Sequence, residues 1–455
     1  MSAQDFPDDF LWGAATASYQ IEGGVDEGGR GPSIWDTFSH APGNTLDGAT
    51  GDIACDHFHR LEDDVALMAE LGLRAYRFSV AWPRVQPGGN GSANTAGLDF
   101  YSRLVDALLE RGIEPVPTLY HWDLPHPLQD AGGWPARQTA EQFSEYTGLV
   151  VRALGDRVRR WITLNEPQVA SFQGYAAGTH APGVTDDAQA LAAAHHLLLG
   201  HGLATAAMRA EGAREVGITL NLATVTADRD REQDAQAAAL VDALQNRLFL
   251  DGVRRGRYPD EVLGAFERTG ARDVLREGDD TAPELDFMGI NYYFGVRVQG
   301  GHEPVEGAWS WPGARELRFM PPEPPLTGMG WPQQPEGLER LLLRVTEEYG
   351  PLPLYVTENG AAFDDYVGHD GAVRDSRRVA YLDAHLRAAH RAIEQGADLR
   401  GYFAWSLLDN FEWALGYSKR FGLIYVDYAT LERIPKSSFA WYRDVIARGG
   451  LGENA

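Results

Sequence analysis

The sequence predicts an α/β protein built as a (β/α)8 TIM barrel, a single domain over residues 1–455 with elaborated loops after the strands. Three observations lead to this fold. The chain has 455 residues, too many for a simple two-layer domain and within the range of a large barrel. Eight short runs of β-forming residues alternate with amphipathic helical stretches. Polar and charged residues gather where most of those runs end.

The eight runs have the length and composition of buried strands. They are rich in β-branched, aliphatic and aromatic residues and are bounded by glycine, proline or polar residues, as the strands of a parallel barrel are. Their ranges are 9–15, 73–80, 113–120, 160–164, 216–222, 285–293, 352–357 and 399–407.

Helical stretches lie between the runs, for example at 62–72, 98–112 and 381–396. Each has apolar residues at i, i+3 and i+4 and stops at a glycine. The alternation predicts parallel strands connected by helices. An open doubly wound sheet is the alternative. It is disfavoured because the Gly-rich segment 23–31 lacks the spacing of a phosphate-binding loop.

Composition excludes several kinds of partner and site. The formal net charge is -25, whereas nucleic acids and anionic membranes attract basic surfaces, so neither is expected as a partner. The single Cys55 rules out an intrachain disulfide and a thiolate metal cluster. No apolar run is long enough to cross a membrane and the N-terminus resembles no signal peptide, which predicts a cytoplasmic protein. Assembly into a homo-oligomer is left open.

Polar, charged and aromatic side chains collect after the runs, at the end of a parallel barrel where active sites are built. Only the fifth run, 216–222, is poor in them. In chain order these residues are Gln20, Arg77, Ser79, His121, Trp122, Asn165, Glu166, Asn291, Tyr293, Glu358, Asn359, Trp405, Asp409, Asn410, Phe411, Glu412 and Trp413.

Two of these residues are glutamates that follow apolar runs, Glu166 in Thr-Leu-Asn-Glu-Pro and Glu358 in Thr-Glu-Asn-Gly. Two carboxyl groups that converge from different strands are the minimal equipment for cleaving a glycosidic bond, one as acid/base and one as nucleophile. Either motif alone is weak evidence, because a glutamate at a strand end can also be a cap or a turn residue. Together, in a chain of this shape, they predict a glycosidase.

Seven segments resemble the signature segments of glycoside hydrolase family 1, in the family's order and within a likeness that spans residues 6 to 447. They are LWGAATASYQIEG (11–23), YRFSVAWPRV (76–85), LYHWDLP (119–125), TLNEP (163–167), GINYY (289–293), YVTENG (355–360) and WSLLDNFEW (405–413). The likeness is greatest to bacterial β-glucosidases. It implies that Glu166 is the acid/base, that Glu358 is the nucleophile and that configuration is retained. It also implies hydrolysis of cellobiose and other β-glucosides, some activity on β-galactosides and β-fucosides, and no cofactor.

The two carboxyl groups need different surroundings, because a nucleophile must stay ionised while an acid holds a proton. In the family that the chain resembles, the counterparts of Arg77 and Tyr293 flank the nucleophile, where they would hold Glu358 anionic. Glu166 would then be protonated beside the charge of Glu358. Arg77 can also be a buried ion-pair partner that stabilises the barrel, and the two roles are compatible.

The resemblance also implies a set of residues around the sugar. Asn165 would bond the 2-hydroxyl, and Trp405 would form an apolar platform. The residues assigned to the substrate are Gln20, His121, Asn165, Tyr293, Trp405, Glu412 and Trp413, and those in supporting positions are Arg77, Trp122, Asn291, Trp331 and Phe421.

A metal site is a competing interpretation of His121, Asp123 and His126. It is disfavoured because Pro125 and Pro127 interrupt the segment, so the three side chains would point in different directions. We therefore expect no metal.

One departure from the family concerns the leaving-group side of the site. Asn-Glu-Pro is commonly followed by Trp, but Gln168 stands in that place. Trp331 would then be the remaining aromatic residue there, and the Pro- and Trp-rich region 300–327 is expected to be a long loop near the same entrance. The preference for the leaving group cannot be predicted from these residues.

Two alternative functions are considered. A subgroup of the family hydrolyses 6-phosphoglycosides and has a lysine where Lys419 stands, but Glu412 would repel a phosphate and Phe421 offers it no hydroxyl. A non-catalytic sugar-binding barrel would lack one of the two glutamates, and both are present. A β-glucosidase is therefore the favoured prediction.

Overall fold

The computed structural model describes residues 4–452 and contains a closed barrel of eight parallel strands. The strands are β2 (Leu11–Ala15), β3 (Ala75–Ser79), β4 (Glu114–Tyr120), β5 (Arg160–Asn165), β6 (Glu215–Asn221), β8 (Phe287–Asn291), β11 (Leu354–Asn359) and β12 (Leu399–Trp405). They follow one another around the barrel in chain order, and β12 pairs with β2 to close it. The predicted (β/α)8 fold is confirmed, and each predicted strand end lies within two residues of the observed one.

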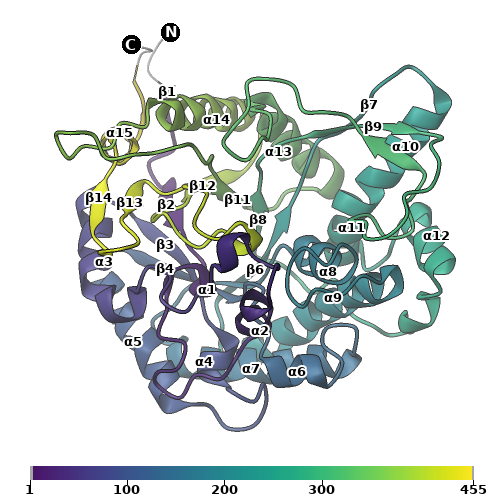
Figure 1. Cartoon of the computed structure of the whole chain (residues 1–455), viewed down its shortest axis with the longest axis horizontal. Helices are drawn as coiled ribbons and strands as arrows, with labels where there is room; N and C mark the ends of the chain where they lie inside the picture. The colour runs from purple at the N-terminus through teal and green to yellow at the C-terminus, as the bar shows by residue number, and fades with distance from the viewer. Residues whose placement is uncertain (1–3, 453–455) are drawn as a thin grey trace.

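Helices lie around the barrel, and the longer ones form its outer layer (Figure 1). In chain order they are α1 (Ser18–Ile21), α2 (Ile34–His40), α3 (His57–Leu71), α4 (Trp82–Val85), α5 (Thr95–Glu110), α6 (His126–Asp130), α7 (Arg137–Leu154), α8 (Pro167–Tyr175), α9 (Asp187–Ala210), α10 (Glu232–Asp242), α11 (Leu248–Arg255), α12 (Asp260–Thr269), α13 (Pro335–Tyr349), α14 (Ser376–Glu394) and α15 (Ser437–Arg448). The predicted helices correspond to α3, α5 and α14, and each begins three to five residues earlier than predicted. Their first turns are mostly polar, so the apolar periodicity does not reveal them.

Shorter strands lie outside the barrel. β1 (Gln4–Asp5) pairs with β15 (Gly450–Leu451), and β13 (Ile424–Val426) pairs with β14 (Arg433–Pro435). β7 (Val225–Ala227), β9 (Val296–Gly300) and β10 (Leu317–Phe319) form a three-stranded sheet. The region 300–327 is therefore not entirely a loop as expected, since it contains β10. With three residues, β10 is too short to show an alternating pattern in the sequence.

Inside the barrel, glycines on one strand lie opposite larger side chains on the neighbouring strand, and these side chains fill the space. Gly13 pairs with Phe403, and a Cβ atom on Gly13 would lie 2.3 Å from that ring. Gly289 pairs with Thr219, and its Cβ atom would lie 2.3 Å from Thr219 Oγ1. Alternation of small and large residues packs a barrel of this size without a central channel.

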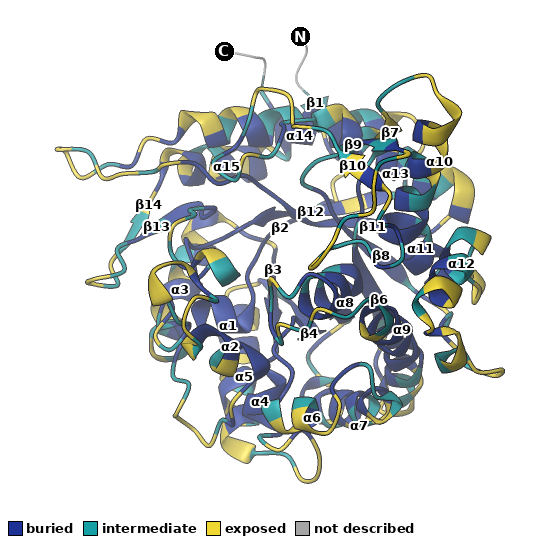
Figure 2. Cartoon of the chain, turned by 45° about the vertical axis from the view of Figure 1, so that its right-hand side comes forward, coloured by how far each residue is buried: buried dark blue, intermediate teal, exposed yellow. Residues whose placement is uncertain are grey.

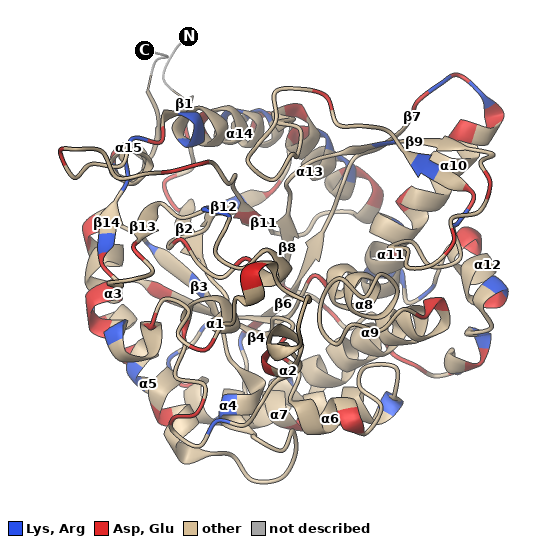
Figure 3. Ribbon diagram, in the orientation of Figure 1, with Lys and Arg blue, Asp and Glu red and all other residues tan. Residues whose placement is uncertain are grey.

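The barrel strands are buried, and the exposed residues lie on the outer faces of the helices and in the peripheral loops (Figure 2). Charged residues follow the same distribution and are mostly peripheral, so much of the acidic excess is on the outside of the molecule (Figure 3). Between residues 4 and 452, none of the helices combines the length and the apolar character that a membrane span requires.

We expect Gly289→Ala to lower the free energy of unfolding by about 1–3 kcal/mol, because the added methyl group overpacks the barrel interior. Urea denaturation followed by circular dichroism measures the change. Gly88→Ala is the matched control, since Gly88 is exposed and a Cβ atom there would meet nothing within 4 Å. Equal stability of the two variants would contradict this account of the interior.

Candidate active site

Two buried glutamates lie at the carboxyl ends of their strands. Glu358 is the fifth residue of β11. Glu166 directly follows β5 and precedes α8, with φ of 48° in the left-handed region. Each residue is 3% exposed. Both predicted carboxyl groups are therefore at the end of the barrel where the other predicted site residues gather.

Glu358 is bonded to a cation and to a hydroxyl group. Arg77 Nη1 donates to Glu358 Oε1 at 2.6 Å, and Tyr293 OH donates to Glu358 Oε2 at 2.7 Å. Arg77 comes from β3 and is fully buried. Both oxygens of this carboxyl group thus accept hydrogen bonds that favour its charged form.

Glu166 is bonded to a neutral amide instead. Asn291 Nδ2 donates to Glu166 Oε1 at 2.6 Å and also to Asn165 Oδ1 at 3.0 Å. Thr357 Oγ1 donates to Asn291 Oδ1 at 2.8 Å, which fixes the orientation of that amide. Glu166 therefore accepts from a neutral donor, whereas Glu358 accepts from a cation.

The protonation of the pair follows from these contacts. Burial and the nearby charge of Glu358 raise the pKa of Glu166 to about 8. Burial also raises the pKa of Glu358, but Arg77 and the Tyr293 hydroxyl act in the opposite direction. Burial raises the pKa of Tyr293 well above its usual value, so the phenol stays protonated as a donor. Near neutral pH the shared negative charge belongs on Glu358 and the proton on Glu166.

The two carboxyl groups open into a cavity of about 290 Å³. Of the predicted site residues, those that line it are His121, Trp122, Glu166, Tyr293, Trp331, Glu358, Trp405, Glu412, Trp413 and Phe421. Arg77, Asn291, Asn165 and Gln20 are not in the lining. The first three bond residues that are, whereas Gln20 bonds Asn410 and Phe411, which directly precede Glu412 in the lining. The cavity is large enough for one sugar ring with part of a leaving group.

Asn165 is engaged at both ends of its amide. Its Oδ1 atom accepts from Arg77 Nη2 at 2.6 Å and from Asn291, and its Nδ2 atom lies 3.0 Å from His121 Nε2. The sequence places Asn165 in contact with the substrate. In the structure it is bonded to three side chains that surround the carboxyl pair, so a sugar must displace or share the His121 contact to reach it.

Three of the predicted sugar-binding residues have a buried polar atom without a hydrogen-bond partner. These atoms are Gln20 Oε1, His121 Nδ1 and Glu412 Oε2. Buried polar atoms are normally paired, so such a group is suited to a polar ligand. Burial lowers the pKa of His121 well below its usual value and keeps the ring neutral. Burial, and then the charge of Glu358, raises the pKa of Glu412 to about 8.

Aromatic rings form much of the cavity wall. Trp413 packs against Trp122 and Trp35, each with 4.6 Å between ring centroids. Trp331 packs against Tyr293 with 5.2 Å between ring centroids. A wall of this kind supplies apolar surface while it leaves orientation to a few polar groups.

Three of the bulky lining residues have positive φ, namely Trp122 (77°), Glu166 (48°) and Trp413 (49°). This conformation is unfavourable for residues with a large side chain and persists where the surroundings impose it. The loops after β4, β5 and β12 are thus held in conformations that bring these side chains to the cavity.

The residues considered as metal ligands do not converge. Asp123 Oδ2 accepts from Ser18 Oγ, while His126 Nδ1 lies beside Thr37 Oγ1 and His121 bonds Asn165. In the part of the chain that the structure describes, no group of three or more His, Cys, Asp or Glu side chains is placed to hold a metal ion.

The family profile of glycosyl hydrolase family 1 matches residues 2–451. A thermostable beta-glucosidase B of Thermobispora bispora is 54% identical over 98% of this chain and 91% of its own length. A solved family 1 β-glucosidase from Thermotoga maritima superposes with a TM-score of 0.93 at 46% identity, over 100% of both chains. A psychrophilic β-glucosidase from Micrococcus antarcticus gives a TM-score of 0.95 at 48% identity, over 98% of both chains.

The chain belongs to glycosyl hydrolase family 1. The resemblance stated from its seven segments is therefore confirmed, and the chain is a glycosidase. A family 1 hydrolase needs a proton donor and a nucleophile. The buried carboxyl pair is the arrangement in this chain that is suited to both tasks.

Sequence reasoning missed part of this family 1 site. Asn221, Gln245 and His180 line the cavity. Asn221 ends β6, the strand predicted to carry little chemistry, and its amide lowers the pKa of Glu166. The polar residue near the end of 216–222 was a usable signal for Asn221. His180 and Gln245 lie far from any strand end, so no pattern in the sequence identifies them. Gln168 also lines the cavity, as its position after Asn-Glu-Pro suggests.

We expect the pKa of Glu166 to fall when Glu358→Gln removes the neighbouring negative charge, because that charge stabilises the protonated form of Glu166. Burial remains, so the pKa should stay above the usual value. NMR titration of carboxyl-labelled glutamates measures it, and Glu166→Gln identifies the resonance. In the wild type the acid is lost as the pH rises through about 8, which should produce the alkaline limb of kcat/KM. An unchanged pKa in Glu358→Gln would contradict the assignment of this charge.

Proposed function

We propose that this family 1 enzyme removes terminal non-reducing β-D-glucosyl residues from cellobiose and other β-glucosides, with retention of configuration. The observation that carries the proposal is the unequal carboxyl pair: Glu358 bonded to Arg77 and Tyr293, and Glu166 bonded to a neutral amide. One group is suited to attack and the other to donate a proton.

In the first step Glu358 Oε attacks the anomeric carbon while Glu166 gives its proton to the glycosidic oxygen. The bond to the leaving group breaks, and a covalent glucosyl-enzyme forms. The negative charge of Glu358 is consumed in that bond, so the pKa of Glu166 falls. Glu166 then takes a proton from water, which attacks the same carbon and releases glucose and Glu358. Two displacements restore the original configuration.

The glycone is proposed to be held by Gln20, His121 and Glu412, which supply the unpartnered polar atoms, with Trp405 and Trp413 as the apolar walls. A site that contains buried polar groups rejects sugars that leave them unpaired. Activity on β-fucosides is included in the proposal, because a relative from Bifidobacterium breve that is 49% identical is named a bifunctional β-D-glucosidase/β-D-fucosidase. Activity on β-galactosides is also proposed.

Small sugar mimics support a single-ring binding site. The Thermotoga maritima relative has been solved with isofagomine lactam and with deoxynojirimycin. A Thermotoga neapolitana relative, 47% identical, is named a 1,4-β-D-glucan glucohydrolase. On these grounds we propose a role in the degradation of cellulose-derived oligosaccharides. The binding sites for further glucose units would extend past Trp331 and Gln168, which line the cavity.

Two alternatives are less well supported. A 6-phosphoglycosidase needs groups that bind the phosphate, but Arg420 Nη1 pairs with Asp409 at 2.6 Å, and Phe421 in the cavity wall offers no hydroxyl. Lys419, which donates to Gly328 O at 2.8 Å, is not sufficient by itself. A non-catalytic sugar-binding barrel does not require a carboxyl group beside a buried guanidinium. A catalytic role therefore explains the pair of Glu166 and Glu358 better than sugar binding alone does.

We expect turnover of 4-nitrophenyl β-D-glucoside to exceed that of its 6-phosphate by at least about tenfold in kcat/KM, because the carboxyl group of Glu412 and the apolar ring of Phe421 line the cavity and neither suits a phosphate. Nitrophenol release measures both rates. 4-Nitrophenyl α-D-glucoside is the control and should not be cleaved. Faster turnover of the phosphorylated substrate would establish the 6-phospho alternative.

We expect Glu358→Ala to lower kcat by roughly six orders of magnitude, the scale seen when the nucleophile of a covalent hydrolase is removed. Added azide should restore turnover and give α-glucosyl azide, because the anion attacks from the vacated side. Product anomers are identified by proton NMR.

Glu166→Ala is the matched control for azide. It retains the nucleophile, so azide should react with the glucosyl-enzyme and give the β-anomer. If both variants gave the same anomer, the roles assigned to the two residues would be wrong.

A further inference from the structure

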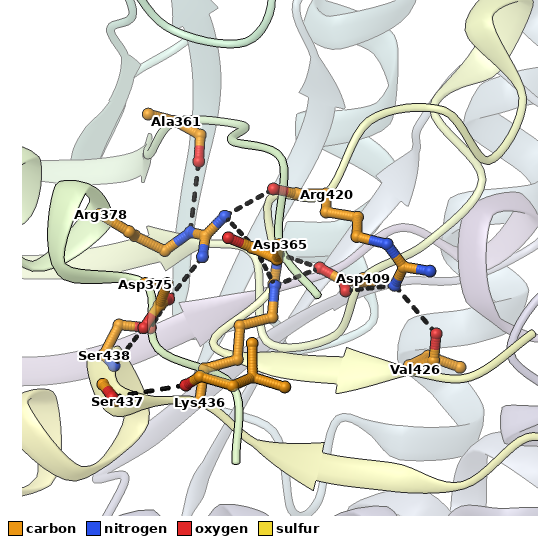
Figure 4. A network of polar contacts seen from close by, with 12 residues as sticks. Ala361, Asp365, Asp375, Arg378, Asp409, Arg420, Val426, Lys436, Ser437 and Ser438 are labelled. Atoms are coloured by element: carbon orange, nitrogen blue, oxygen red, sulfur yellow. Dashed lines mark hydrogen bonds and ion pairs between the residues drawn. The ribbon is translucent and has the colours of Figure 1, made fainter. Parts of the chain in front are cut away.

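A buried ion network joins the loops that follow β11 and β12 (Figure 4). Its members, which we call the ion network, are Asp365, Asp375, Arg378, Asp409, Arg420 and Lys436. Five of the six side chains are at most 2% exposed, and Arg420 is 17% exposed. None of these residues lines the cavity or touches the carboxyl pair in the described structure.

Lys436 is at the centre of the ion network. Its Nζ atom donates to Asp365 Oδ2 and to Asp409 Oδ1, each at 2.6 Å. Arg378 donates to Asp365 at 2.7 Å and to Asp375 at 2.5 Å. Three cations thus face three carboxylates. Removing one cation leaves a buried charge without its partner, which is strongly unfavourable.

The choice of lysine at this position is informative. Only Lys419 and Lys436 are lysines among the 40 basic residues of the chain. An ammonium group is compact and can donate in several directions, whereas a guanidinium is a rigid planar fork. The single Nζ atom of Lys436 donates to carboxylates on two different loops, a geometry that suits the compact group.

Asp409 connects Lys436 to the residues that would contact the sugar. Asn410 follows Asp409, and its Oδ1 atom accepts from Gln20 Nε2 at 2.9 Å. The same Gln20 atom donates to Phe411 O at 2.8 Å, and Phe411 N donates back to Gln20 O at 3.1 Å. The segment directly after Asp409 thus fixes the Gln20 amide and leaves its Oε1 atom free. Glu412, with its free Oε2 atom, is the next residue.

The same network holds the segment that carries Phe421. Gly422 N donates to Asp409 Oδ1 at 2.9 Å, and Arg378 Nη2 donates to the carbonyl of Arg420 at 2.6 Å. Phe421 lies between these two contacts and lines the cavity. Asp409 therefore accepts bonds from Arg420 and Gly422, on either side of Phe421, and itself directly precedes the segment 410–412.

We propose that Lys436 is a positioning residue for sugar recognition: through Asp409 it holds residues 410–412 against Gln20, so that Gln20 Oε1 and Glu412 Oε2 are presented to the same sugar. The inference rests on the proposed glucosidase function for the identity of the ligand. Lys436 touches no substrate, and it acts on binding and on the choice of sugar more than on the chemical step.

Lys436→Met tests this proposal, because it keeps the length of the side chain and removes its charge. We expect KM for 4-nitrophenyl β-D-glucoside to rise about tenfold, with a smaller change in kcat, since Glu166, Glu358 and Arg77 keep their contacts. The preference for the β-D-glucoside over the β-D-xyloside, which lacks the hydroxymethyl group, should fall by about fivefold. A change in sugar preference is not expected from general loss of stability.

Arg160→Met is the matched control. Arg160 also bridges two carboxylates, Glu114 and Glu215, but it does so where β4, β5 and β6 begin, at the opposite end of the barrel. This variant should lose stability in thermal denaturation while it keeps the wild-type KM and sugar preference. A similar rise in KM for Arg160→Met would show that any broken ion pair has this effect and would overturn the proposal.

Asp365→Asn is the second variant, and it decides the question if Lys436→Met does not fold. It removes the charge of Asp365 and leaves Asp409 as the carboxylate that pairs with Lys436, so we expect the same changes at about half their size on a logarithmic scale. KM and sugar preference both within about twofold of wild type in the folded variants would overturn the proposal.

The proposed glucosidase function and the positioning role of Lys436 can be contradicted separately. If the wild type does not hydrolyse the glucoside, the proposed function is wrong, and the positioning role is still measured by calorimetric binding of deoxynojirimycin, an imino sugar. Weaker binding by Lys436→Met than by Arg160→Met would support the role of Lys436, and equal binding would exclude it.

Discussion

The guanidinium of Arg77 joins four barrel strands to the carboxyl group that we assign as nucleophile. From β3 it donates to Thr118 on β4, to Asn165 at the end of β5, and to the Thr357 carbonyl and Glu358 on β11. A fully buried cation is costly unless every donor is paired, and here strand ends on both sides of the barrel supply the acceptors. The closed sheet and the charged state of Glu358 therefore depend on the same side chain, so the structural and functional interpretations of Arg77 hold together.

The difference in protonation between Glu166 and Glu358 follows from the position of Arg77. Both carboxyl groups are buried, so burial alone would favour the protonated form of each. Arg77 and Tyr293 contact one of them, and the other receives only amide donors and the repulsion of its neighbour. The unpartnered atoms of Gln20, His121 and Glu412 and the positive φ values of Trp122 and Trp413 are further unfavourable features in and around the cavity. Such features are expected where a site is preorganised for a ligand at some cost to stability.

The sequence was sufficient for the fold and for the position of most of the site. Eight buried runs mark the strands, and a parallel barrel brings their ends together, so Glu166, Glu358 and Tyr293 could be placed near one another without coordinates. Other features depend on loop conformation, which no periodic pattern encodes. His180 and Gln245 reach the cavity from segments far from strand ends. The ion network joins residues up to 71 positions apart through side chains that look like ordinary surface charges in the sequence.

The scarcity of lysine has a practical consequence for attaching the enzyme to other molecules. Lys436 is enclosed by two carboxylates and is 0% exposed, whereas Lys419 is partly exposed. Reagents that modify side-chain amines will therefore react at Lys419, two residues from Phe421 in the cavity wall. Coupling to a solid support through this amine would orient the entrance of the barrel toward the support and hinder the entry of long substrates. Attachment through the many peripheral carboxylates would instead leave the entrance open to solvent (Figure 3).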